Sequence, residues 1–150
     1  MKSTITFSLL LICTLFFASC SKDGGTSESA ESRVARLLTN SGNRVWHLNK
    51  VYENTVEVIL TDIQKQYTKT FTADPGNIDP LNAKKGTFTD SNGYLGEWTL
   101  LNASQIYVKI ANNQAGPVAI TYIINTISDT MLDIEYTANM KTVREVYYGY

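Results

Sequence analysis

The stretch Tyr94–Ala111, YLGEWTLLNASQIYVKIA, decides the fold. Apolar and polar side chains alternate through its two halves, 94–101 and 105–111, with the period of a β-strand that buries one face. Only Asn102-Ala103-Ser104 separates the halves. Because so short a connection forces neighbouring strands to run antiparallel, the stretch predicts a β-hairpin with one apolar face.

The same pattern fills most of the chain, with Asn, Asp, Gly and Pro between the runs. The predicted strands span 44–52, 55–63, 66–72, 86–89, 94–101, 105–111, 118–127, 131–137 and 142–148. A long meander with one apolar face loses its exposed edges by closing on itself. We therefore predict an all-β, antiparallel up-and-down barrel of eight or nine strands; the alternative is an open sheet covered by a helix.

One short helix is predicted before the first strand. The apolar residues that recur at helical spacing are Ala30, Val34, Leu37 and Leu38. Ser29 is a suitable N-cap, and Gly42 is the expected terminator. The folded domain is accordingly expected to span 30–150 and to begin with an amphipathic helix.

The N-terminus has the pattern of an export signal. Lys2 precedes an apolar stretch from Ile5 to Phe17, and two small residues then precede Cys20. This order matches the lipobox of bacterial lipoproteins, whose cysteine receives a diacylglycerol. About 15 apolar residues are fewer than the roughly 20 that a transmembrane helix needs. We predict removal of residues 1–19 and lipidation of Cys20.

Residues 20–29 are small and polar, which is typical of a flexible tether. The acyl chains on Cys20 would hold the protein on its membrane. Ser21 stands at the second mature position, where Asp would indicate retention in the inner membrane. We expect a cell-envelope protein of the outer membrane, on either the periplasmic face or the cell surface.

Charge and cysteine content argue against nucleic-acid binding and against an internal disulfide. The chain has 13 basic and 14 acidic residues and shows no basic stripe, so nucleic acid is not an expected partner. The two cysteines are Cys13, within the signal, and Cys20. Because processing removes the first, the mature chain is expected to form no internal disulfide.

The residues needed for common catalytic sets are missing. His47 is the only histidine, and strand alternation places it opposite Trp46, on the outer face. With no second histidine and no thiol besides Cys20, catalytic triads and histidine-rich zinc sites lack their parts. We expect a protein that is not an enzyme and has no cofactor.

Two acidic patterns allow other interpretations. Asp133 and Glu135 lie two apart on one strand face, so their carboxyls could sit near the spacing of a glycosidase pair, and the segment 74–79 offers oxygen atoms for calcium. Acidic residues on the wet face of a strand and an Asp-Pro-Gly turn explain both patterns more simply. A hydrolase that uses this carboxylate pair is therefore the third hypothesis.

Aromatic residues are numerous enough to line a cavity inside the barrel. The candidates are Trp46, Tyr67, Phe71, Phe88, Trp98, Tyr107, Tyr122 and Tyr136. An eight-stranded barrel has room either for its own side chains or for one small ligand. Both outcomes stay open at this stage.

Short motifs extend over about residues 33–148. They are LLTNSG at 37–42 leading to VWHL at 45–48, YTKTFTAD at 67–74, GTF at 86–88 and GEWTL at 96–100. With these motifs the chain resembles the lipocalin-like domain lipoproteins of Bacteroidetes. The resemblance implies a small lipocalin-like barrel with a helix near its N-terminus. In true lipocalins a late arginine packs on the tryptophan of the first strand, and here Arg144 is the candidate partner of Trp46.

Together these features predict a membrane-anchored lipoprotein whose barrel binds a small apolar or amphipathic ligand without catalysis. The alternative is a filled barrel that serves as a protein-interaction, inhibitor or accessory module in an envelope complex. For that alternative, the long connection 73–85 is the expected contact site.

Overall fold

The structure is a computed structural model, and it describes residues 27–74, 76, 84–114 and 116–150. The predicted signal 1–19, the lipidation site Cys20 and most of the tether lie outside these residues. Among the described residues, no helix is long and apolar enough to cross a membrane.

The predicted helix is present as α1 (Ala30–Thr39). The Ser29 hydroxyl caps its start by accepting a hydrogen bond of 3.1 Å from the Ser32 backbone N–H. At its end, Asn40 adopts the left-handed conformation with φ 49°, and its N–H bonds to the Arg36 carbonyl. Gly42 was the expected terminator, but the asparagine takes that role because its side chain tolerates this backbone region.

Within the part of the chain that the structure describes, nine strands follow, largely where the alternation predicts them. They are β1 (Asn43–Glu53), β2 (Val56–Val58), β3 (Thr68–Ala73), β4 (Lys85–Asp90), β5 (Leu95–Asn102), β6 (Gln105–Ile110), β7 (Val118–Ile127), β8 (Met131–Ala138) and β9 (Lys141–Gly149). A short 3-10 helix, η1 (Gln64–Gln66), lies between β2 and β3.

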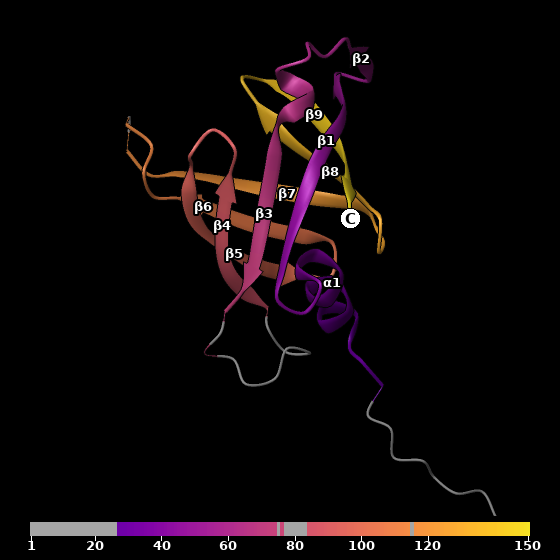
Figure 1. Cartoon of the computed structure of the whole chain (residues 1–150), viewed down its shortest axis with the longest axis vertical. Helices are drawn as coiled ribbons and strands as arrows, with labels where there is room; N and C mark the ends of the chain where they lie inside the picture. The colour runs from indigo at the N-terminus through magenta and orange to yellow at the C-terminus, as the bar shows by residue number, and fades with distance from the viewer. Residues whose placement is uncertain (1–26, 75, 77–83, 115) are drawn as a thin grey trace, which may run out of the picture.

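The sheet closes into a barrel, as predicted. From β3 to β9 each strand pairs antiparallel with the next, and β1 joins β3 on one side and β9 on the other. Eight strands therefore form a closed, lipocalin-like barrel, and β2 is a ninth strand outside the ring (Figure 1). The alternative of an open sheet is excluded by the β1–β9 ladder.

One edge of β1 is shared between two partners. Its first half pairs with β3, and its last three residues pair with β2. The predicted strand 55–63 is thus wrong beyond Val58, because the chain leaves the sheet there. The segment 59–67, which contains η1, rises over one end of the barrel before the chain returns as β3 (Figure 1).

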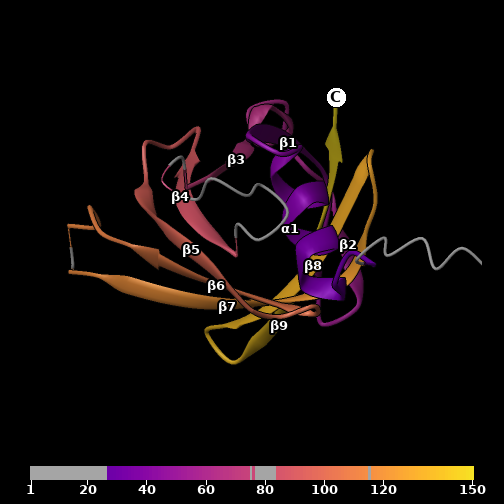
Figure 2. The same ribbon diagram turned by 90° about the horizontal axis from the view of Figure 1, so that it is seen from below.

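The other end of the barrel is filled and covered. The most completely buried large side chains include Trp46, Phe71, Phe88 and Trp98. Helix α1 lies across this end, as Figure 2 shows from below. The Trp46 indole N–H donates a 3.0 Å hydrogen bond to the Leu38 carbonyl near the end of the helix. The first strand therefore both fills the barrel and fixes α1 over it.

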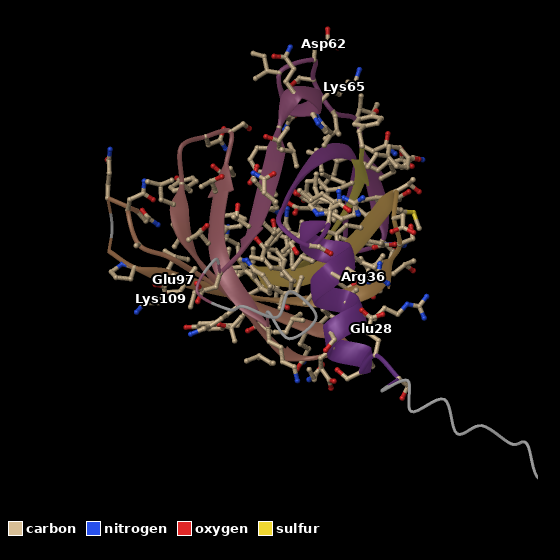
Figure 3. All side chains as sticks on the ribbon, turned by 60° about the horizontal axis from the view of Figure 1, so that its bottom comes forward. Glu28, Arg36, Asp62, Lys65, Glu97 and Lys109 are labelled. Atoms are coloured by element: carbon tan, nitrogen blue, oxygen red, sulfur yellow. The ribbon has the colours of Figure 1, made fainter. Side chains whose placement is uncertain are left out.

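Polar residues cover the outside, as the alternation predicts. Glu97 of β5 and Lys109 of β6 are opposite each other in the register, and Figure 3 shows both on the outer surface. His47 is exposed and packs edge-on against Tyr150 at 5.4 Å. The only histidine thus lies on the outer face, as expected.

Candidate functional site

A pocket of about 570 Å³ opens at the uncovered end of the barrel. Its apolar walls come from β1, β2, β9 and the segment 59–67, and include Leu48, Val51, Val58, Leu60 and Val143. Tyr67, Tyr136 and Glu145 line its deeper part. Because α1 covers the opposite end, the pocket lies at the end of the barrel that the helix leaves uncovered.

The floor of this pocket is built around a buried ion pair. The Glu145 carboxylate of β9 pairs with the Lys69 ammonium of β3. It also accepts hydrogen bonds from the hydroxyls of Tyr136, at 3.0 Å, and Tyr147, at 2.6 Å. The Lys69 side chain is 3% exposed and that of Glu145 is 11% exposed. The ion pair therefore turns its carboxylate, not its ammonium, toward the pocket.

Four tyrosine rings surround the Lys69 ammonium. Its Nζ lies 4.8 Å from the ring centre of Tyr122, 4.9 Å from Tyr147, 5.6 Å from Tyr67 and 5.9 Å from Tyr136. Aromatic faces attract a cation within about 6 Å, and more strongly where water is excluded. These rings partly replace the water that the Lys69 ammonium loses on burial.

Hydrogen bonds and burial set the protonation of the floor. Burial by itself raises the pKa of Glu145, but the Lys69 charge and the hydrogen bonds from Lys69, Tyr147 and Tyr136 together hold that pKa below its ordinary value. Burial, followed by the nearby carboxylates, raises the pKa of Tyr67, Tyr136 and Tyr147. At neutral pH the floor therefore holds one ionised carboxylate and protonated tyrosines.

A pH dependence of stability follows from the lowered pKa of Glu145. The folded state favours the ionised form, so this stabilisation is complete above the ordinary carboxyl pKa of about 4.3 and is lost as pH falls below it. We expect the free energy of unfolding to fall from about pH 5 to pH 3. In Glu145→Gln that fall should be smaller, as measured by urea unfolding at several pH values.

Glu57→Gln is the matched control, because Glu57 is half-exposed and pairs with Lys50 on the outside. This variant should keep the acid dependence of the original protein. Equal acid dependence in Glu145→Gln and Glu57→Gln would contradict the role of the buried carboxylate.

The structure places the predicted ligand-lining residues in four different surroundings. Tyr67 and Tyr136 line the pocket. Trp46, Phe71, Phe88 and Trp98 are at most 1% exposed and belong to the filled end. Tyr122 is 2% exposed and contacts Lys69 behind the floor. Tyr107 alternates with the buried Ile106 and Val108, so its prediction as a lining residue is wrong: it is on the outer face.

The expected contact between Arg144 and Trp46 is also wrong. The first and last strands do meet, but the register places Trp46 opposite Gly149 and Arg144 opposite Tyr52. Arg144 therefore lies 5.3 Å from the Tyr52 ring on the outside. The cation over Trp46 is Arg44, at 5.1 Å, whose guanidinium also donates to the Leu37 carbonyl of α1.

The acidic pair suggested for hydrolysis lies on the outer face. Both carboxylate oxygens of Asp133 accept hydrogen bonds from Arg144, at 2.9 and 2.6 Å, and Asn125 donates to one of them at 3.3 Å. Glu135 is opposite Arg144 in the strand register, and both line a small hollow of about 190 Å³. Asp133 is therefore held in an ion pair with Arg144, away from the pocket.

The calcium candidate at 74–79 lies largely outside the described residues. Asp74 is described, and its carboxylate accepts from the Gly76 N–H at 2.9 Å and lies 3.8 Å from the Lys85 ammonium. In the part of the chain that the structure describes, no group of three His, Cys, Asp or Glu side chains is placed to hold a metal.

Lys69 and Glu145 are the site residues that sequence reasoning missed. A signal was available: Lys69 has the same strand parity as Tyr67 and Phe71, and Glu145 has the same parity as Val143 and Tyr147. Each charge therefore has the strand parity of the apolar face. Two opposite charges on inward positions of different strands indicate a buried ion pair.

No protein-family model, no curated protein and no solved structure matches this chain. Functional conclusions therefore depend on the barrel and its pocket.

Proposed function

We propose that the protein binds a small amphipathic molecule in the pocket at the open end of its barrel, without catalysis. The observation that supports this proposal is the combination of apolar walls with a polar floor at Glu145, Tyr136 and Tyr67. Its volume of about 570 Å³ falls in the range of small-molecule sites. The walls suit an aliphatic or aromatic body, and the floor suits a polar head group.

A variant that fills the pocket tests this proposal. Val143→Trp places an indole in the cavity from β9, whereas Tyr148→Trp changes a half-exposed position of the same strand. In isothermal titration with a panel of short-chain amphiphiles below their micellar concentrations, the original protein and Tyr148→Trp should show saturable one-to-one binding. Val143→Trp should bind at least tenfold more weakly. The absence of binding across the panel would contradict the proposal.

We also propose that a lipid on Cys20 anchors the protein to the outer membrane, in the manner of the lipocalin-like lipoproteins that the chain resembles. The support is the lipobox pattern before Cys20. The described chain begins at Ser27 beside α1, at the end of the barrel opposite the pocket (Figure 1). An anchor on that side leaves the pocket mouth accessible. Labelled palmitate should enter the protein and be lost in Cys20→Ala; incorporation that survives the substitution would contradict the assignment.

A second candidate function is contact with an envelope protein through the rim of the pocket. Three apolar side chains there are almost fully exposed: Ile59 at 95%, Ile63 at 83% and Met140 at 99%. Figure 3 shows Asp62 and Lys65 of the same segment 59–67 projecting from this end, opposite Glu28 and Arg36 beside α1. For this function, Ile63→Glu should reduce crosslinking to the partner, whereas Val143→Trp should not.

A further inference from the structure

We infer that the pocket selects ligands whose head group is a primary amine in its cationic form, in preference to a carboxylate. This inference rests on the proposed ligand-binding function and names the chemical class of the ligand. It is carried by the charges, the burial and the hydrogen bonds of the pocket lining.

The charged groups that reach the pocket are acidic. Glu145 lines the floor and Glu53 lines the wall near the mouth. Among the described lining residues there is no lysine or arginine. Lys69 lies beneath the floor, with its ammonium held by Glu145 and the surrounding tyrosine rings. A head group that enters the pocket therefore meets the carboxylate before the ammonium, which favours a cation and disfavours an anion.

The hydrogen-bond donors of the floor are already engaged. The Tyr136 hydroxyl donates to Glu145, and the Tyr67 hydroxyl donates to Asp90 at 2.8 Å. What these groups still offer to a ligand is acceptor capacity, because a phenolic oxygen keeps lone pairs after it donates. Glu145 Oε1 accepts from Tyr136, and a carboxylate oxygen has room for a second donor. An ammonium, with three N–H donors and no acceptor, complements this floor, whereas a carboxylate brings only acceptors.

The remaining polar groups of the pocket do not decide between a cationic and an anionic head group. Gln64, Gln66, Ser91 and Asn92 line the upper part of the pocket, and each is neutral and able both to donate and to accept. Glu53 is partly exposed and pairs with Lys141 at 2.7 Å, so solvent weakens its field. The selectivity is thus assigned to the buried floor, with Glu145 as the residue that contacts the ammonium.

Three ligands with the same chain and different heads provide the test: octylamine, octan-1-ol and octanoate, titrated calorimetrically at neutral pH. We expect octylamine to bind at least tenfold more tightly than octanoate, with octan-1-ol between them. Octanoate binding as tightly as octylamine, or more tightly, would overturn the inference and leave the proposed ligand-binding function standing. Failure of all three ligands to bind would overturn both.

Paired variants connect the preference to the floor. Lys69→Met/Glu145→Gln removes both buried charges, so no charge is left unpaired in the core. The amide oxygen of the glutamine still accepts hydrogen bonds from the tyrosines. Its preference for octylamine over octanoate should fall below threefold. The matched control is Lys50→Met/Glu57→Gln, which removes an exposed ion pair on the outside and should keep the tenfold preference. Circular dichroism of both variants verifies that the barrel is folded, and an undiminished preference in the folded floor variant would refute the role of Glu145.

Discussion

Lys69→Met is expected to lower the free energy of unfolding by about 3–5 kcal/mol. The substitution leaves the Glu145 carboxylate inside the barrel without its counter-charge, while the Lys69 side chain is itself only 3% exposed. Attraction between the charges and the contacts to four tyrosine rings are lost together. An unpaired buried charge costs more than the pair contributes, because its desolvation is no longer offset. Urea denaturation at neutral pH measures the effect.

Two further variants distinguish the loss of the ion pair from a simple packing defect. Lys69→Met/Glu145→Gln should recover more than half of the lost stability, since no charge then remains unpaired. Lys50→Met, which breaks a half-exposed pair with Glu57, should change stability by less than about 1 kcal/mol. A loss for Lys69→Met no larger than that for Lys50→Met would contradict the assignment of a buried ion pair.

Gly86→Ala is expected to destabilise the barrel by about 3 kcal/mol or more. A Cβ at this position would lie 1.9 Å from the Thr72 carbonyl oxygen and 2.7 Å from the Trp98 indole nitrogen. The first contact is with backbone of the paired strand, which cannot rotate away. The Trp98 indole N–H also donates to that same carbonyl at 2.9 Å, so a shift that relieves the clash would break this hydrogen bond. The glycine of the motif GTF therefore makes room for the tryptophan of GEWTL.

Gly42→Ala is the matched control. A Cβ there meets no atom within 4 Å. Its effect on the free energy of unfolding should lie within about 1 kcal/mol, because the alanine adds no clash and lowers the entropy of the unfolded chain. Similar stability losses in Gly86→Ala and Gly42→Ala would contradict the proposed clash between a Cβ at position 86 and the backbone of β3.

Local features of the sequence were sufficient to predict most elements of this protein, with the end of β2 and the 3-10 helix η1 as exceptions. Strand alternation separates the inward Trp98 and Ile106 from the outward Glu97 and Lys109, and the short connections make neighbouring strands antiparallel. Helix α1 follows from its apolar spacing and the Ser29 cap. These properties depend on residues that are close together in the chain.

The partners of the inward residues were decided only by the tertiary structure. Lys69 and Glu145 are 76 positions apart, and their contact depends on how β3 and β9 are placed around the closed barrel. The register between β1 and β9 likewise puts Gly149, and not Arg144, opposite Trp46. Alternation tells which side of a strand a residue occupies, but the position along the barrel comes from closure of the ring and from the excursion at 59–67. That is why the sequence predicted a barrel, while only the folded chain determined which end is filled and which end holds the pocket.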